Sequence, residues 1–457
     1  MNRRTFNSFL AGGIATAESR ASGAMAADAQ TTSFGANEDR RTAWYRDAKF
    51  GMFIHWGPYS VASVEASWPI MRPSKQFPIT ETEYRALPAR FNPVRFDPDA
   101  WVALAKSAGQ RYMVFTTKHH DGFCMFDSEF TNYKIANTPY GKDIVAQLAA
   151  ACHRAQMPIG FYYSPPDMSH PAYRDTSQPA SKNWNGEPTR EVWPLYLHYL
   201  ELQLRELLTR YGKVAVIWFD GLDNQGKYDG YRMARVIHNL QPGTLMNNRI
   251  GIPGDFETPE QFIPSSIPIK GSTLDYDHRK TGTKRGDVPP PQDFELWETC
   301  MTINHTWAYN KNDREFKPAK ELVRMLIQVA SKGGNFLLDV GPEPDGTIQP
   351  EFQERLRAIG KWLSVNGDAI YGTTYGPLQT LPFGKTTAKG NNVYLEVFDW
   401  PSAGSLRLPG LPRNVRSVSA LAGNRPLRFH QAGSALEIDL SGMQPDPYAT
   451  VLKFSME

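Results

Sequence analysis

Short apolar runs alternate with longer segments whose apolar residues recur every three or four positions between residues 44 and 360. The runs are typical of buried strands and the longer segments of amphipathic helices. We expect strands at residues 49–56, 111–117, 158–164, 214–219, 244–249, 294–299 and 335–340, and helices at 97–109, 143–156, 193–211, 231–240 and 319–331. This alternation predicts a parallel sheet covered by helices, and the number of repeats favours an α/β fold of the (β/α) TIM-like barrel type.

Two regions depart from the alternating pattern. Residues 251–291 are rich in proline and irregular, so the barrel is expected to be distorted there. After residue 371, short alternating runs at residues 392–398, 405–408, 435–440 and 449–454 are separated by proline and glycine turns, with no helical segment between them. Such a series is typical of an antiparallel β-sandwich. We therefore expect a catalytic barrel over residues 36–366 and a sandwich domain over residues 371–457.

The N-terminus has the features of an export signal. Arg3 and Arg4 precede a modestly apolar stretch at residues 9–17, and small residues follow at positions 24–26. Paired arginines beside a weakly apolar stretch are typical of twin-arginine signals. No other apolar run reaches the ~20 residues that a membrane span needs. We expect residues 1–26 to be a signal peptide and the mature protein to be periplasmic or secreted, without a membrane span.

Charge and cysteine content narrow the classes of partner and site. The formal charge of +3 over 457 residues gives no reason to expect nucleic acid or an anionic membrane as a partner. Cys124, Cys152 and Cys300 lie far apart and lack the spacing of metal ligands or of a disulfide framework. We expect buried or free thiols, and the sequence does not indicate an oligomeric state.

Polar and aromatic clusters lie at the carboxyl ends of five of the expected strands, at residues 55–57, 118–123, 162–164, 218–221 and 247–249. In a parallel barrel the carboxyl ends of the strands meet at one face and carry the active site. Five clusters in consecutive strands are better explained as the walls of one pocket than as independent loops. Asp220, at the end of its strand, is taken alone an even choice between a catalytic carboxylate and a helix-capping aspartate.

The residues of these clusters resemble one family. Residues 49–57, 118–123, 162–164, 218–221, 297–300 and 331–338 closely resemble, in order, the α-L-fucosidases of glycoside hydrolase family 29. The resemblance implies an exo-acting retaining hydrolase that removes terminal α-L-fucose from fucosylated oligosaccharides or glycoconjugates by double displacement, without a cofactor. It also fits a barrel followed by a β-sandwich.

The resemblance assigns the nucleophile but leaves the acid/base open. Asp220 matches the family nucleophile, and a retaining glycosidase needs a second carboxyl about 5–5.5 Å from it. The candidates are Asp255, Glu257, Glu260 and Glu298. Glu260 is preferred because it lies 11 residues after Arg249, a spacing that resembles the family's. Glu257 is the second choice, and Glu298 fits a supporting carboxylate.

Further residues are expected to bind the sugar by resemblance. His55, His119, His120 and Arg249 match residues that hydrogen-bond fucose hydroxyls. The remaining matches to the pocket are Trp68, Tyr163, Trp218, Trp297 and Glu298. The family's usual glutamate before Trp68 is Ser67 here, which leaves one sugar contact open, although Glu65 lies two positions away.

Three alternatives follow from the same residues. The histidines could bind a metal, but they lack the spacing of a metalloprotease motif and adjacent strand residues face opposite sides. Neutral imidazoles that contact sugar hydroxyls explain them without a metal. The same mechanism could act on α-L-galactosides, which carry a C6 hydroxyl. A carbohydrate-binding protein without catalysis is the third alternative.

Overall fold

A parallel sheet of seven strands, in the order β5-β4-β3-β2-β1-β7-β6, forms the larger part of the fold. The computed structural model describes residues 40–186, 189–221, 226–271, 287–411 and 413–457, so the expected export signal lies outside the described residues. The strands are β1 (Phe50–Ile54), β2 (Met113–Lys118), β3 (Ile159–Tyr163), β4 (Val216–Phe219), β5 (Leu245–Met246), β6 (Glu298–Thr302) and β7 (Asn335–Val340).

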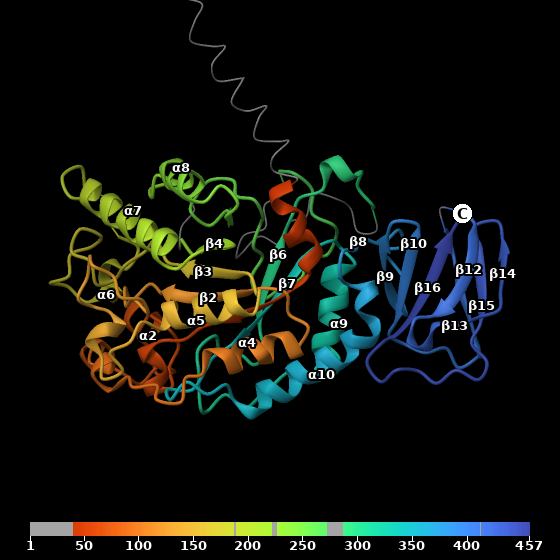
Figure 1. Cartoon of the computed structure of the whole chain (residues 1–457), viewed down its shortest axis with the longest axis horizontal. Coiled ribbons are helices and arrows are strands. Elements are labelled where there is room, and N and C mark those ends of the chain that lie inside the picture. The colour runs from red at the N-terminus through yellow and green to blue at the C-terminus, as the bar shows by residue number, and fades with distance from the viewer. Residues whose placement is uncertain (1–39, 187–188, 222–225, 272–286, 412) are drawn as a thin grey trace, which may run out of the picture. The chain divides into compact units, whose positions relative to one another are not determined.

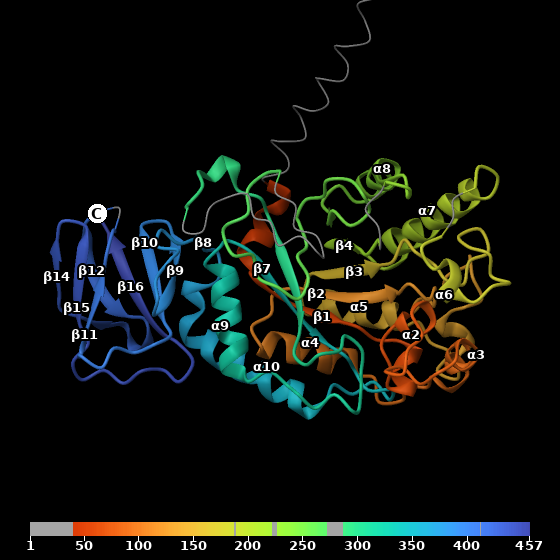
Figure 2. The ribbon, with the colours of Figure 1, turned by 180° about the vertical axis from the view of Figure 1, so that it is seen from behind.

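Helices surround this sheet in both ribbon views (Figures 1 and 2). The longer ones are α4 (Pro98–Ser107), α5 (Ile144–Arg154), α7 (Trp193–Arg210), α8 (Gly230–Leu240), α9 (Ala319–Ala330) and α10 (Pro350–Asn366). The short α-helices are α2 (Trp68–Met71), α3 (Glu81–Arg85) and α6 (Ala180–Asn183). Short 3-10 turns occupy η1 (Pro58–Ala62), η2 (Leu87–Arg90), η3 (Ile135–Asn137), η4 (Pro291–Asp293) and η5 (Gly367–Ala369). None of the described helices has the length and apolar character needed to span a bilayer.

Aspartates start two of the barrel helices. The Asp97 side chain accepts a hydrogen bond from the Ala100 amide at 3.0 Å, and Asp143 accepts one from the Ala146 amide at 2.8 Å. Each carboxylate satisfies an amide that has no partner within its own helix. The starts of α4 and α5 are therefore fixed by the local sequence, as the pattern predicted.

Alternate residues of each barrel strand pack into the interior. The interior cluster contains residues such as Phe53, Tyr112, Val114, Tyr162, Val216, Trp218, Cys300 and Leu337. Their neighbours on the same strands pack outward against the helices, for example Met52, Phe115, Phe161, Tyr163 and Ile217. This is the two-residue period of a strand. The three cysteines are buried and unpaired, as expected.

The barrel is irregular between β5 and β6, where the sequence predicted a distortion. Residues 255–261 lie between these strands: the Asp255 amide donates to the Met246 carbonyl at 2.7 Å, and the Gln261 amide donates to the Cys300 carbonyl at 3.0 Å. An isolated bridge also joins Glu260 to Cys300. Pro259 has no amide hydrogen, so a continuous ladder cannot form.

Two expected strands differ from the structure in this region. The strand expected at residues 244–249 is reduced to β5, Leu245–Met246, and the one expected at residues 294–299 is β6, Glu298–Thr302. The Met246 amide donates a hydrogen bond to the Asp255 side chain at 2.8 Å. A side chain therefore takes the place of a strand partner where β5 ends. An apolar run predicts that a strand exists more reliably than it predicts where the strand ends.

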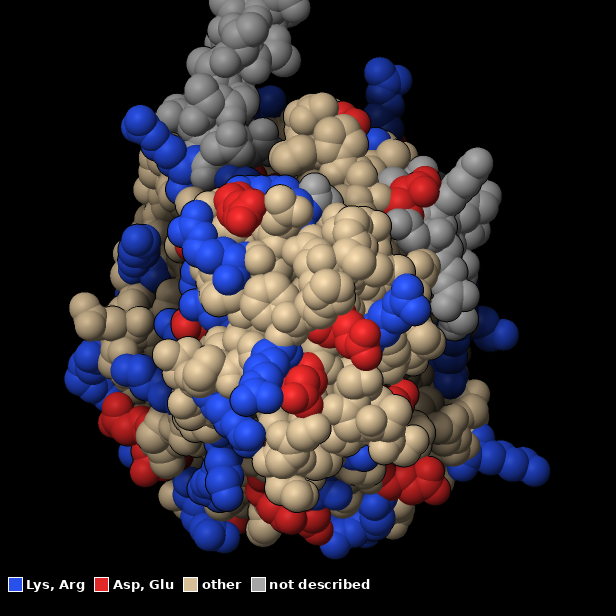
Figure 3. All heavy atoms as spheres, turned by 90° about the vertical axis from the view of Figure 1, so that its right-hand side faces the viewer, with Lys and Arg blue, Asp and Glu red and all other residues tan. Residues whose placement is uncertain are grey.

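Residues after the barrel form two antiparallel sheets, which confirms the expected β-sandwich class. One has the order β13-β12-β16-β10-β9-β8 and the other β11-β15-β14. A separate apolar cluster forms the core of these sheets. On the face drawn in Figure 3, acidic and basic residues are interspersed. The elements are β8 (Thr374–Tyr375), β9 (Gly384–Lys389), β10 (Asn392–Val397), β11 (Ser405–Leu408), β12 (Val415–Ala420), η6 (Ala422–Asn424), β13 (Arg425–Pro426), β14 (Phe429–Ala432), β15 (Ala435–Asp439) and β16 (Thr450–Met456).

The crossing of α4 and α10 gives a testable prediction about stability. A Cβ at Gly360, in α10, would lie 1.8 Å from the Ser107 carbonyl oxygen, so Gly360→Ala must displace backbone. The gain in helix propensity of about 1 kcal/mol is smaller than the overpacking, and we expect a net destabilisation of about 1–3 kcal/mol. Thermal denaturation followed by circular dichroism measures it.

Gly243→Ala is the matched control, because nothing lies within 4 Å of a Cβ at that position. Its melting temperature should match that of the wild-type protein. Equal melting temperatures for the two variants would contradict a close crossing at Gly360.

Candidate active site

A cavity of about 300 Å³ opens at the carboxyl ends of the barrel strands. Most of the side chains that form it are buried, whereas Arg72 is exposed and Trp68, Trp184, Glu260 and Trp307 are half-buried. The lining residues are Phe53, His55, Trp68, Arg72, His119, His120, Tyr162, Trp184, Trp218, Asp220, Arg249, Glu260, Cys300 and Trp307. The structure thus brings together side chains that are as far apart in the sequence as Phe53 and Trp307.

Asp220 lies directly after β4 at the base of this cavity. Its Oδ2 accepts a hydrogen bond from the Tyr162 hydroxyl at 2.7 Å, and its Oδ1 accepts one from Arg249 Nη1 at 3.0 Å. Asp220 is 9% exposed. Since it lines the cavity, a ligand reaches its carboxylate from the cavity, and the rest of the residue is enclosed. These partners hold an ionised carboxylate in one orientation.

Glu260 contacts the same guanidinium nitrogen as Asp220. Arg249 Nη1 donates to Glu260 Oε2 at 2.9 Å and to Asp220 Oδ1 at 3.0 Å, so the two oxygens are no farther apart than the sum of these distances, about 5.9 Å. This limit is compatible with the ~5–5.5 Å that separates the carboxyls of a retaining glycosidase.

Arg249 is itself held by the segment that carries Glu260. Its Nε donates to the Thr258 hydroxyl at 2.8 Å and its Nη2 donates to the Thr258 carbonyl at 2.9 Å. The guanidinium carbon lies 4.8 Å from the centre of the Trp218 ring. The hydrogen bonds to Thr258 and the contact with the Trp218 ring fix Arg249, and its Nη1 in turn orients both carboxylates.

The environment of Glu260 favours its protonated form. Burial raises the pKa of Glu260 above its ordinary value, and the charge of Asp220 raises it further, against the opposing effect of Arg249. A carboxylic acid that stays protonated nearer neutral pH is suited to donate a proton.

The other acidic residues expected near the nucleophile do not line the cavity. Glu257 Oε2 accepts from Asn248 Nδ2 at 2.6 Å, and Asp255 accepts the Met246 amide. Glu298 lies in the barrel interior, where it accepts hydrogen bonds from Trp218 Nε1 at 2.9 Å and from the hydroxyls of Tyr45 and Tyr112. Burial raises the pKa of Glu298 to about 7. Glu298 therefore supports Trp218 from below and does not reach the substrate space.

Each of the three expected histidines lines the cavity and is fixed through Nδ1. The partners are Asp339 Oδ1 for His55 at 2.7 Å, Ser67 Oγ for His119 at 2.6 Å and Ser164 Oγ for His120 at 2.6 Å. Burial lowers the pKa of His55 and of His120 to about 4 and the pKa of His119 well below its ordinary value. Neutral rings held in this way leave Nε2 to contact a ligand.

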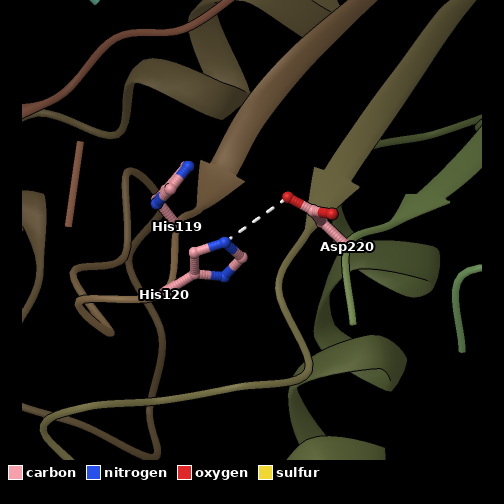
Figure 4. Close-up of side chains that lie close together, drawn as sticks. All are labelled: His119, His120 and Asp220. Carbon is pink, nitrogen blue, oxygen red and sulfur yellow. Dashed lines mark ion pairs between the residues drawn. The ribbon is translucent and has the colours of Figure 1, made fainter. Parts of the chain in front are cut away.

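His119, His120 and Asp220 also lie close enough together to be considered as metal ligands (Figure 4). One ligand atom from each lies within 4.8 Å of the others, and His120 Nε2 is 3.5 Å from Asp220 Oδ2. Arg249, however, already places a positive charge 3.0 Å from the same carboxylate, and it would repel a cation. The arrangement suits a polyhydroxylated ligand better than a metal ion.

Two residues expected in the pocket wall lie outside it. Tyr163 donates to Gln203 Oε1 at 2.8 Å and packs outward, and Trp297 Nε1 donates to the Lys332 carbonyl at 3.1 Å. The reason is the two-residue period of the strands: Tyr162 and Glu298, their neighbours, face the interior. Strand parity relative to Trp218 and Phe53 could have identified Tyr162 as the tyrosine of the pocket.

Ser67, which stands where the family usually has a glutamate, changes the contacts of the loop that follows β1. Trp68 lines the cavity as expected, and Ser67 Oγ contacts His119 and accepts the Asp121 amide at 2.8 Å. Glu65 does not reach in: its carboxylate accepts the amides of Trp307 and Ala308 at 2.7 and 2.9 Å. Glu65 thus fixes Trp307, a wall residue that the sequence pattern did not indicate.

Comparison with known protein sequences gives one family. Residues 17–368 match the family model described as alpha-L-fucosidase. The alpha-L-fucosidase of Branchiostoma floridae is 30% identical over 442 residues, which cover 90% of this chain and 92% of that protein. The tissue alpha-L-fucosidase of Bos taurus is 28% identical, with 91% of this chain and 88% of that protein covered.

Solved structures agree with the sequence comparison. Alpha-L-fucosidase isoenzyme 1 from Paenibacillus thiaminolyticus superposes with a TM-score of 0.81 at 34% identity, covering 92% of this chain and 99% of that one. A GH29 alpha-L-fucosidase from Bacteroides thetaiotaomicron, described as a trapped covalent intermediate with 2-fluoro-fucosyl fluoride, gives 0.77 at 26% identity, covering 92% of this chain and 96% of that one. A covalent intermediate is the mark of a retaining mechanism. The chain described here therefore belongs to the α-L-fucosidase family, GH29, and is a retaining glycoside hydrolase that releases α-L-fucose.

Proposed function

We propose that Asp220 is the nucleophile and Glu260 the acid/base with which this α-L-fucosidase hydrolyses terminal fucosides. The observation that carries the assignment is the shared contact with Arg249 Nη1, which limits the distance between the two carboxyl oxygens to about 5.9 Å. Among the described carboxylates, Glu260 is the one that lines the cavity together with Asp220.

In the first step Asp220 attacks the anomeric carbon as Glu260 transfers its proton to the glycosidic oxygen. The bond from the anomeric carbon to the aglycone breaks, and a bond to the Asp220 oxygen forms. In the second step Glu260, now ionised, removes a proton from water, which displaces Asp220 and releases fucose. The raised pKa of Glu260 suits its first role, and the nearby charge of Arg249 stabilises its ionised form in the second.

The cavity fits one terminal sugar. At about 300 Å³ it is at the small end of ligand pockets, and its base is closed by buried side chains such as Phe53 and Trp218. Neutral His55, His119 and His120 would hydrogen-bond the fucose hydroxyls, while the aromatic rings would contact the apolar face that carries the C6 methyl. A cavity that is closed at its base admits only a terminal sugar, which supports exo action.

Substitution of the two carboxylates tests the assignment. Asp220→Asn should lose nearly all turnover on every α-L-fucoside, because the covalent step is removed. Glu260→Gln should lower kcat/KM about 10²–10⁴-fold on a fucosylated oligosaccharide, whose leaving oxygen needs a proton. The same variant should lower kcat/KM far less on 2,4-dinitrophenyl α-L-fucoside, whose leaving group departs without a proton. Steady-state kinetics on both substrates measures the difference.

Glu257→Gln is the matched control, since it makes the same change in a carboxylate that contacts Asn248 outside the cavity. It should keep the wild-type ratio of rates on the two substrates. If Glu257→Gln showed the dependence on the leaving group and Glu260→Gln did not, Glu257 would be the acid/base.

The pH profile gives a second test of Glu260. Because the proton must be on Glu260 at the start, kcat/KM should fall as pH rises through the pKa of Glu260, which burial raises above its ordinary value. Glu260→Gln should remove this alkaline limb. With pKa values of about 4, His55 and His120 stay neutral between about pH 5 and 8 and add no limb there.

Glu298→Gln distinguishes Glu260 from Glu298 as the group that titrates, because the pKa of Glu298 is also raised, to about 7. The alkaline limb should persist in this variant. If the alkaline limb disappeared in Glu298→Gln and remained in Glu260→Gln, the group that titrates would be Glu298.

We also propose that the protein is exported through a twin-arginine pathway, on the strength of Arg3, Arg4 and the apolar stretch at residues 9–17. Replacing both arginines with lysine keeps the charge and should retain fucosidase activity in the cytoplasm of a bacterial host. The wild-type chain should deliver that activity to the periplasm or medium. Equal distribution of activity between the fractions for both chains would refute the proposal.

A further inference from the structure

An exposed arginine lies at the mouth of the fucose pocket. Arg72 follows α2 and contributes to the cavity lining, yet its side chain is exposed, whereas Asp220, His119 and His120 are all buried. Since the bottom of the cavity is enclosed, the sugar that leaves with the glycosidic oxygen must extend toward this mouth. Arg72 is therefore placed to contact the aglycone.

Two indole rings hold the Arg72 side chain. Its guanidinium carbon lies 5.3 Å from the centre of the Trp68 ring and 5.1 Å from the centre of the Trp184 ring. Trp68 begins α2 and Trp184 follows α6, and these two helices contact each other. Cation–π contacts with two rings reduce the motion of an otherwise flexible side chain without using its hydrogen-bond donors on an anion.

The charge of Arg72 has no anionic partner among the described residues. There its side chain makes neither an ion pair nor a hydrogen bond, in contrast to Arg249, which contacts two carboxylates. Glu81, an acidic residue that contacts α6 through the Ala180 amide, is already paired with Arg85 and Arg174. The N–H groups of Arg72 are thus available to a ligand.

The chemistry of these side chains suits a charged sugar. A planar guanidinium recognises sulfate and carboxylate groups through paired N–H donors, which a lysine cannot reproduce. The flanking indole faces can pack against the apolar face of a sugar ring.

We propose that Trp68, Arg72 and Trp184 form a binding site for an anionic aglycone, in which Arg72 pairs with a sulfate ester or a carboxylate on the sugar next to the fucose. The enzyme then prefers fucosides whose neighbouring sugar is negatively charged. This inference rests on the proposed function, because the position of Asp220 and Glu260 defines the side from which the aglycone leaves. Arg72 is a determinant of specificity and takes no part in bond cleavage.

Three matched substrates test the site: an α-L-fucosyl disaccharide with a neutral second sugar, the same disaccharide with a sulfate ester there, and the corresponding uronic acid. For the wild-type chain, kcat/KM should be on the order of tenfold higher on an anionic substrate than on the neutral one, the effect of one charge-assisted contact. The ratio should fall as salt is added. Whether sulfate or carboxylate gives the larger ratio identifies the preferred anion.

Arg72→Gln should bring the anionic-to-neutral ratio close to one, and Arg72→Lys should keep part of it, in a more salt-sensitive form. Arg235→Gln is the matched control, since Arg235 is an exposed arginine of α8 outside the cavity, and it should keep the wild-type ratio and activity. Melting temperatures show whether each variant folds.

The outcomes separate this proposal from the catalytic assignment. A wild-type ratio near one, or a ratio that Arg72→Gln leaves unchanged, would overturn the anionic site and would indicate a platform for neutral sugars only. A chain in which Glu260→Gln behaves like the wild type on all substrates would instead overturn the proposed function. Loss of the ratio in Arg72→Gln, with the neutral disaccharide still hydrolysed, supports the site.

Discussion

The active site depends on one cation. Arg249 contacts Asp220 and Glu260 through a single nitrogen and is itself fixed by Thr258. Two carboxylates this close repel each other when both are ionised, and the guanidinium between them reduces that repulsion while burial still favours protonation of one. Removing the positive charge would leave Asp220 and Glu260 without the cation that they share, which is why the geometry of the pair follows from the placement of Arg249.

Beneath this pair the barrel interior forms a continuous support. Glu298 accepts the Trp218 indole N–H, the Trp218 ring stacks on Tyr162 with centroids 5.7 Å apart, and the Tyr162 hydroxyl donates to Asp220. All three side chains occupy inward positions, on β3, β4 and β6. The two-residue period of the sheet therefore builds the base of the pocket as well as the core.

The repeating pattern predicted the barrel, the sandwich and the strand ends at which Asp220, His55, His119 and His120 gather. It did not predict which side of a strand Tyr163 and Trp297 occupy, because a run that is apolar on both faces carries no alternation. Nor could it place Glu65, whose partners Trp307 and Ala308 lie more than two hundred residues away and are backbone amides, which leave no signal in the sequence. Glu260 was preferred because its spacing from Arg249 resembles the family's, since its segment has no periodic pattern.

The contact between Glu65 and the backbone of Trp307 has a consequence for biosynthesis. It joins a loop that follows β1 to one that follows β6, so the wall at Trp307 cannot be completed until most of the barrel has emerged from the ribosome. N-terminal fragments that end before β6 would carry Asp220 and all three histidines but not a closed pocket. Sugar recognition is thus among the last properties that the growing chain acquires, and truncated chains would lack it.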